Sequence, residues 1–325
     1  MKYIIGAYAS APSLKSNDKL LEDEFYNKLI NSIPQIMGLE IPFFGMEIHK
    51  FGSDFLLNYI NPEWNNILTC IPGVMENLSK NPHFGLASDN YSGRLNALDM
   101  YKRANELCHK ICDLYGDNSI IAVQIVTAPS VPVEGVSSSR ESLLKSMEEI
   151  LFLDWRDSKI VIEHVDSCGP DLNFEKGFLT LEDEIEVLLK LSNIHNVGIT
   201  INWARSAIEG KNSDKPLEHI KLALKYNLLS GLIFSGTSKD DENYGSWSDS
   251  HMPFAESYDV DNFERNSLLT YENIFNTLKL IDLKHLDYLG IKLLSDTSDM
   301  DRRVGLNKDA IYILENIISE LQLLN

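Results

Sequence analysis

Three ionisable residues directly follow an apolar run at positions 160–162. Glu163, His164 and Asp166 come at the end of a segment that lacks the polar alternation of a half-exposed strand. Such a run is typical of a parallel strand covered on both faces. A buried carboxylate there needs a metal ion, a hydrogen-bond network or a cationic partner, since an unpaired buried charge costs on the order of several kcal/mol. The pattern makes Glu163 a candidate base or metal ligand.

Side chains alternate along a regular strand, so Glu163 points away from His164 and Asp166. We expect Glu163 to face the site. We expect His164 and Asp166 to belong to its wall or to the layer behind it, where His164 can contact a substrate or transfer a proton.

Two further polar residues interrupt apolar strands. Glu40 stands within Gly38–Phe43, and Gln124 stands within Ile120–Thr127. Both are candidate substrate-binding residues, because a carboxylate and an amide can each bind sugar hydroxyls. A buried ion pair for Glu40 and a structural hydrogen-bond network for Gln124 remain open alternatives.

The segment Gly198–Arg205 ends in an amide and a guanidinium. Asn202 is a candidate substrate-binding residue, and Arg205 can hold a carboxylate or phosphate in a bidentate fork. Arg205 can equally neutralise Glu163 or Asp166, so both interpretations stay open.

A histidine and a tryptophan lie close together in the later stretch Ser246–Pro253. Trp247 can stack on a sugar ring, and His251 can bind a metal or transfer a proton because its usual pKa lies near neutrality. The alternative for His251 is a solvated loop residue.

A lone lysine stands among aliphatic residues in Gly290–Leu294. Lys292 is unusual because lysines are seldom buried. It can pair with Glu163 or Glu40, bind an anionic substrate group, act as a base if desolvation lowers its pKa, or form a Schiff base.

Eight apolar runs must position these residues, and each is followed by a segment with helical periodicity. The runs begin near Tyr3, Ile36, Ile67, Ile120, Ile160, Val197, Gly231 and Tyr288. Eight such alternations predict a single (β/α)₈ TIM barrel over residues 1–325, with a doubly wound open sheet as the alternative. Long loops are expected after the third and seventh strands, at 72–94 and 237–266, as walls of the site or as solvent loops.

The composition excludes several partners. With 48 acidic and 29 basic residues the net charge is −19, which disfavours nucleic acid and anionic membranes. No apolar run reaches the length of a membrane span, and the run 2–7 is too short for a signal peptide, so we expect a cytoplasmic protein. Ser138 and Glu141 have the spacing of a capping box, so the serines at 137–139 predict a helix cap, with a phosphate site at that helix start as the alternative. No glycine-rich loop precedes them, and no nucleotide cofactor is indicated.

The whole chain resembles the xylose isomerase-like TIM barrel superfamily, and within it an uncharacterised bacterial family. The resemblance rests on a glutamate ending strand five, a polar residue ending strand six and a histidine after strand seven. The segments that carry it are Tyr3–Tyr8, Gly38–Gly45, Ile162–Ser167 and His251–Phe254.

The resemblance implies a divalent cation at the strand ends and isomerisation or epimerisation of sugars. By position Glu163, Asn202 and His251 match metal ligands, but Lys292 stands where the resemblance calls for a carboxylate, and a protonated lysine cannot ligate a cation.

We therefore expect an isomerase or epimerase that removes a proton next to the carbonyl of a small carbohydrate, with Glu163, Lys292 and His251 as catalytic groups. The cation would be Mg²⁺, Mn²⁺ or Zn²⁺. A metal-free barrel that binds a sugar or sugar acid without turnover, and a hydrolase or lyase that uses Glu40 with Glu163, are the alternatives. The sequence specifies no oligomeric state.

Overall fold

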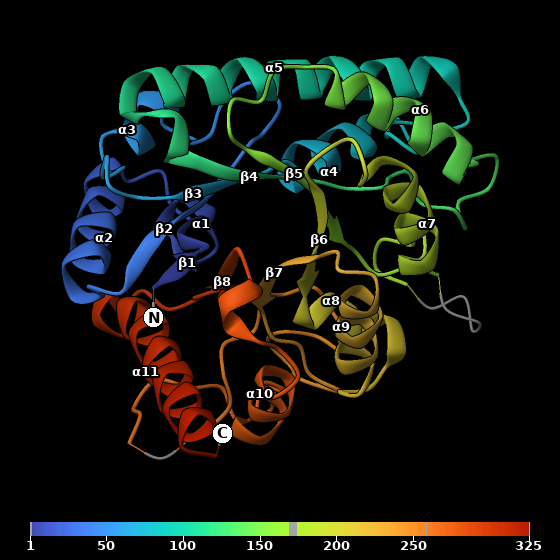
Figure 1. The fold of residues 1–325 in the computed structure, drawn as a ribbon. Coiled ribbons are helices and arrows are strands. Elements are labelled where there is room, and N and C mark those ends of the chain that lie inside the picture. Colours follow the sequence, from blue (N-terminus) through green and yellow to red (C-terminus); the bar gives the residue numbers. More distant parts are fainter. Residues whose placement is uncertain (1, 169–173, 258, 325) are drawn as a thin grey trace. The chain divides into compact units, whose positions relative to one another are not determined.

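The strands form one closed parallel barrel in the order β1 to β8, which confirms the predicted (β/α)₈ fold (Figure 1). The computed structural model describes residues 2–168, 174–257 and 259–324. The strands are β1 (Tyr3–Ile5), β2 (Ile36–Pro42), β3 (Asn66–Thr69), β4 (Ile120–Ile125), β5 (Lys159–His164), β6 (Val197–Asn202), β7 (Leu229–Phe234) and β8 (Tyr288–Ile291). Their first residues lie within two positions of the predicted ones, because a buried parallel strand needs an unbroken apolar run.

Helices alternate with these strands. They are α1 (Ala7–Ser10), α2 (Lys19–Ser32), α3 (Ser53–Leu57), α4 (Ile71–Lys80), α5 (Tyr91–Tyr115), α6 (Arg140–Leu151), α7 (Leu181–Leu191), α8 (Trp203–Gly210), α9 (Lys215–Lys225), α10 (Tyr271–Leu278) and α11 (Met300–Leu324). Short 3₁₀ turns lie at Pro12–Leu14, Asp117–Ser119 and Leu283–His285. In the described part of the chain, none of the helices has the length and apolarity that a bilayer crossing requires.

Side-chain caps explain where several helices begin. Asp18 accepts hydrogen bonds from the backbone N–H of Leu20 and Leu21 at the start of α2, at 2.9 and 3.2 Å. Ser139 accepts from Ser142 N at 3.2 Å and starts α6. The expected serine cap is thus confirmed. The capping residue is Ser139, one position after Ser138, which the spacing to Glu141 favours.

The segment after β3 differs from the expected long loop. Residues 71–80 form α4, with Pro72 in the first turn, where its missing N–H costs no helical hydrogen bond. Only residues 81–90 remain as connection before α5.

The segment after β7 contains no helix or strand between residues 235 and 270 in its described part. An antiparallel bridge between Gly236 and Met252 holds it together. Trp247 and His251 adopt positive φ angles of 50° and 53°, which are uncommon outside glycine and are concentrated at functional sites.

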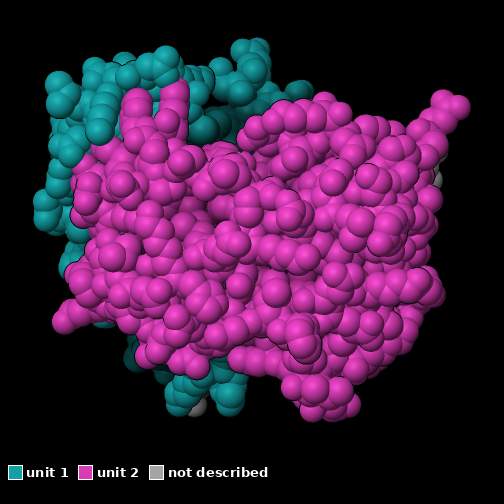
Figure 2. Space-filling model, turned by 90° about the horizontal axis from the view of Figure 1, so that it is seen from above, with its two compact units in different colours: residues 1–39, 201–222, 230–325 teal, residues 40–200, 223–229 magenta. Residues whose placement is uncertain are grey.

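The chain divides into two compact units, which Figure 2 shows in different colours. Unit 1 comprises Met1–Leu39, Ile201–Leu222 and Ser230–Asn325, and unit 2 comprises Glu40–Thr200 and Ala223–Leu229. In unit 2 the register aligns Thr69 with Gln124, and Gln124 with Val161. In unit 1 it aligns Phe234 with Ile291.

Candidate functional site

In unit 2 the central group is the carboxylate of Glu163, next to last in β5 and fully buried. The hydroxyl of Thr69, at the end of β3, donates a hydrogen bond to Glu163 Oε2 at 3.5 Å. The register places Gln124 beside Thr69, and its side chain is buried as well. Two of the predicted site residues, Glu163 and Gln124, therefore lie at the carboxyl ends of adjacent strands. Thr69 is an addition that the apolar pattern of its strand did not signal.

A buried tyrosine lies behind this group. Tyr101 on α5 accepts a hydrogen bond from Val126 N at 3.3 Å. Burial first, and then the proximity of Cys70 and Glu163, raise the pKa of the Tyr101 hydroxyl well above its usual value. Tyr101 is therefore a protonated, neutral neighbour of the Glu163 carboxylate. Glu40, in β2, is 1% exposed and stands in register with Ile67.

His164 lies on the other side of β5. Its Nδ1 is 2.8 Å from Glu184 Oε2 on α7, and Thr127 Oγ1 donates to Glu184 Oε1 at 2.8 Å. All three side chains are buried. The expected alternation of Glu163 and His164 thus places His164 against a helix, and its contact with a substrate stays a prediction.

Asp166 anchors the segment that follows β5. Its Oδ2 accepts hydrogen bonds from the backbone N–H of Glu175 and Lys176 at 2.7 and 2.9 Å. The Asp166 carbonyl also accepts from Phe178 N at 3.1 Å. The place of Asp166 in the wall of a site stays a prediction.

In unit 1 Lys292 directly follows β8 and is fully buried. Its Nζ lies 5.1 Å from the centre of the Tyr8 ring, within the range of a cation–π interaction. Tyr8 belongs to α1, directly after β1, and is half-buried. No pattern in the sequence marked Tyr8 as a site residue. Its position three residues after a buried strand was the available signal.

Four residues of unit 1 form a chain of contacts around an aspartate. Arg205 Nε donates to Asp249 Oδ2 at 3.3 Å, and His251 Nδ1 lies 3.5 Å from Asp249 Oδ1. His251 Nδ1 also lies 2.8 Å from Ser235 Oγ, one residue after β7. The side chains of Arg205 and Asp249 are both buried. Asp249 is the ion-pair partner of Arg205 that sequence reasoning missed, although it lies two residues before His251 in the same stretch.

The remaining predicted residues of unit 1 are Asn202 and Trp247. Asn202 ends β6 and is fully buried, and its side chain does not cap α8. The Trp247 ring centre lies 5.9 Å from Lys211 Nζ. Trp247 is partly exposed, which agrees with an aromatic surface that a ligand can reach.

The start of α6 is occupied by a carboxylate of the protein itself. Ser139 and Ser142 donate to Asp89 Oδ1 at 2.5 and 2.7 Å. Partial burial acts to raise the Asp89 pKa, but hydrogen bonds from Ser139, Ser142 and Ser137 lower it overall. The structure therefore supports the helix-cap interpretation of these serines over a phosphate site.

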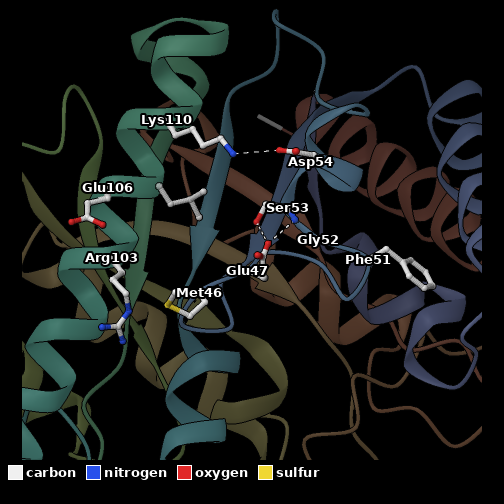
Figure 3. Close-up of a pocket in the computed structure, with 10 residues that line it drawn as sticks. Met46, Glu47, Phe51, Gly52, Ser53, Asp54, Arg103, Glu106 and Lys110 are labelled. Atoms are coloured by element: carbon white, nitrogen blue, oxygen red, sulfur yellow. Dashed lines mark hydrogen bonds and ion pairs between the residues drawn. The ribbon is translucent and has the colours of Figure 1, made fainter.

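A hollow of about 500 Å³ lies between the segment after β2 and one face of α5, all in unit 2 (Figure 3). Figure 3 shows Lys110 directed toward Asp54, at an Nζ–Oδ1 distance of 3.3 Å. Glu47 accepts from Ser53 N at 2.7 Å. Lys110 and Asp54 are both exposed, and none of the predicted site residues lines the hollow.

Several solved structures share this barrel fold. A structure of a D-tagatose 3-epimerase-like protein matches 99% of this chain and 100% of its own, with a TM-score of 0.61 and 13% identity. A structure of a 3-keto-D-glucoside 4-epimerase from E. coli matches 97% of this chain and 100% of its own, with a TM-score of 0.57 and 13% identity. A structure of the IOLI protein with a bound zinc atom matches 99% of this chain and 98% of its own, with a TM-score of 0.58 and 14% identity.

The chain belongs to the family described as a domain of unknown function, DUF4862, which matches residues 4–306. A protein of Salmonella typhimurium, described as uncharacterized protein STM3670, is 34% identical over 318 residues and covers 96% of each chain. The predicted resemblance is thereby confirmed.

Proposed function

We propose that this protein is an isomerase or epimerase of a sugar or sugar phosphate, which acts by removing a proton next to a carbonyl group. The observation that carries the proposal is the complete burial of two ionisable side chains at strand ends, Glu163 at β5 and Lys292 at β8. Barrel enzymes build their active sites at the carboxyl ends of the strands. The sugar epimerases among the structural neighbours support the class of substrate.

In the proposed reaction the Glu163 carboxylate removes the proton and an enediolate forms. The ammonium group of Lys292 stabilises the negative charge that develops, as preorganised cations do in water-excluded sites. Return of the proton to the neighbouring carbon of the enediolate gives the isomer. Return to the opposite face of the carbon that lost it gives the epimer. In a metal-free site His251 is the second candidate for proton transfer, through Nε2, since Nδ1 contacts Ser235. With a cation bound, Nε2 would be the ligand atom instead.

A divalent cation is the proposed cofactor, with Glu163, Asn202 and His251 as ligands. The donor chemistry of these residues fits, because a carboxylate, an amide oxygen and an imidazole all bind Mn²⁺ or Zn²⁺, and oxygen ligands also suit Mg²⁺. The contact between His251 Nδ1 and Ser235 is the type of hydrogen bond that orients a metal-binding imidazole. When bound, the cation would polarise the carbonyl oxygen of the substrate. Lys292 is not a ligand in this proposal.

The deciding experiment screens ketoses, aldoses and their phosphates for isomerisation, with Mg²⁺, Mn²⁺ or Zn²⁺ added, and then compares variants on the substrate found. Glu163→Gln keeps the side-chain shape and should lower turnover by about 10²- to 10⁴-fold. Glu149→Gln, on the exposed face of α6, is the matched control and should leave turnover unchanged. Full activity in Glu163→Gln would overturn the assignment.

The second candidate is a barrel that binds a sugar or sugar acid without turning it over. The observation that favours it is Lys292, which stands where the superfamily resemblance calls for an acidic ligand. Carbohydrate binding that persists without any added metal, and with no product formed, would select this function.

A further inference from the structure

Helix α11 contains a glycine against which the segment after β7 packs. Gly305 lies inside this helix, where glycine is less favourable than any other residue except proline. A methyl group at this position would come within 2.8 Å of Asn262 Cγ, and closer still to Nδ2. The glycine therefore leaves the room that the Asn262 side chain occupies directly against the helix.

An aspartate of the same helix holds this asparagine in place. Asp309 Oδ2 accepts hydrogen bonds from both Asn262 N and Asn262 Nδ2, at 2.9 and 2.8 Å. Asp309 follows Gly305 by four residues, so the two lie on one face of α11. The Asn262 amide could make room for a larger residue at position 305 only by giving up its hydrogen bond to Asp309.

An arginine on the same face binds the next two residues of the segment. Arg302 Nη2 donates to the Phe263 carbonyl at 3.3 Å and to Glu264 Oε1 at 3.0 Å. Arg302 precedes Gly305 by three residues, which again places it on the shared face. We call Arg302, Gly305 and Asp309 the α11 clamp, and we call residues 262–264 the strap.

The strap is bound in turn to the stretch that carries His251. Glu264 N donates to the Phe254 carbonyl at 2.8 Å. The Phe254 ring packs edge-on against Phe234, the last residue of β7, with 6.1 Å between the ring centres. His251 precedes Phe254 by three residues, so the strap fixes the chain shortly after this histidine.

The stretch around His251 needs such external support. Trp247 and His251 both have positive φ angles, and strained backbone of this kind persists only where the surrounding structure over-determines it. Leu294 N holds the His251 carbonyl at 2.7 Å from the side of the segment after β8. The strap holds the same stretch through Phe254, on a path that ends at α11.

We propose that Gly305 and Asp309 are positioning residues, which act through the strap to hold Trp247 and His251 in place. Neither residue touches a substrate in this proposal. The inference rests on the proposed function only for the consequence in catalysis, because the positioning itself can be measured without any turnover.

Amide hydrogen exchange on the full chain measures the positioning directly. Trp247 N and Met252 N donate to backbone carbonyls at 2.8 and 2.9 Å, so their exchange reports opening of this stretch. Asp309→Ala should speed exchange at both amides about tenfold, because the strap loses its acceptor. Asp309→Asn keeps a side-chain oxygen that can accept and should stay within about twofold of the wild type. Exposed Asp157→Ala is the control.

Unchanged exchange at Trp247 and Met252 in Asp309→Ala would overturn the proposal. The same holds if Asp309→Asn is as fast as Asp309→Ala, since the effect would then not depend on an acceptor for the strap.

A double-mutant cycle tests the glycine. Gly305→Ala alone should speed exchange at Met252 about tenfold, although alanine favours the helix, because the methyl group displaces Asn262. In an Asn262→Gly background the space is empty, so adding Gly305→Ala should leave the exchange unchanged. An equal effect of Gly305→Ala in both backgrounds would show that Gly305 does not act through the strap.

The kinetic consequence follows once a substrate is known. At a temperature well below the unfolding midpoint of each variant, Asp309→Ala should lower kcat/KM about tenfold, and Asp309→Asn should recover it, because a displaced His251 no longer meets the substrate. The two proposals can fail separately. Full turnover in Glu163→Gln would overturn the catalytic assignment, whereas exchange in Asp309→Ala decides the role of the α11 clamp by itself.

Discussion

At the scale of single residues, the most unusual group is the buried ammonium of Lys292. Removing an ammonium from water costs several kcal/mol unless other groups compensate, so a lysine at 0% exposure requires partners. The Tyr8 ring, 5.1 Å from Nζ, is one of them and contributes on the order of 2 kcal/mol in a desolvated site. A side chain maintained at such a cost is more consistent with a chemical role than with packing.

Replacing this lysine should therefore separate activity from stability. Lys292→Met keeps the aliphatic stem and removes the charge, so we expect turnover of the identified substrate to fall about 100-fold or more, because a preorganised cation is lost. The free energy of unfolding, from urea denaturation, shows whether lost turnover reflects lost stability, since removing one partner of a buried charge pair costs about 3–5 kcal/mol. Lys308→Met, exposed on α11, is the control. Unchanged turnover in Lys292→Met would remove this residue from the mechanism.

Some site residues could be predicted from sequence and others could not, for a physical reason. The opposite orientations of Glu163 and His164 follow from strand alternation, and the hydrogen bond between His164 and Glu184 agrees with it. The pairing of Arg205 with Asp249 spans 44 residues and depends on the path of an irregular segment. No periodicity specifies such a path.

At the scale of elements, the segments after the strands are held by specific backbone contacts. Asp166 holds the segment after β5 by accepting two backbone N–H groups. Removing the carboxylate leaves both donors without that acceptor, at about 1–3 kcal/mol each if they stay buried. We expect Asp166→Ala to make residues 174–178 cleavable by protease under native conditions, because local opening becomes easier.

The protease measurement has two controls. Asp166→Asn retains one side-chain oxygen as acceptor and should be cleaved at an intermediate rate, while exposed Asp157→Ala should match the wild-type chain. Equal cleavage rates in all four proteins would show that Asp166 does not hold this segment.

The start of α6 should make stability depend on pH in the acid range. The Asp89 pKa is lowered in the folded chain, so the unfolded chain takes up the proton first as the pH falls. The stability from Asp89 is present above its unfolded pKa of about 3.9 and is lost as the pH falls through the folded pKa. Urea midpoints should therefore fall more steeply below about pH 4 in the wild-type chain than in Asp89→Asn. Parallel curves would contradict the role of Asp89, and Asp157→Asn should follow the wild type.

At the scale of the whole molecule, the barrel was the most predictable feature. Eight strand-then-helix alternations leave few architectures for a chain of 325 residues, and the closed strand order agrees with them. The exception was α4, because the polar residues of 72–94 suggested a loop while Pro72 marked a first helical turn. Composition also sets the net charge of −19, which favours the binding of cations over phosphate polymers.

The proposed cofactor gives a prediction for the stability of the whole chain. A ligand that binds only the folded protein stabilises it by mass action, by about 2.7 kcal/mol at a concentration 100 times its Kd. After dialysis against a chelator, adding Mn²⁺ should raise the midpoint of thermal unfolding in a saturable manner. Glu163→Gln should weaken this response, since it replaces the proposed carboxylate ligand, and Glu149→Gln should retain it. A midpoint that does not move with Mn²⁺, Mg²⁺ or Zn²⁺ would instead support a metal-free site, in which Lys292 supplies the positive charge.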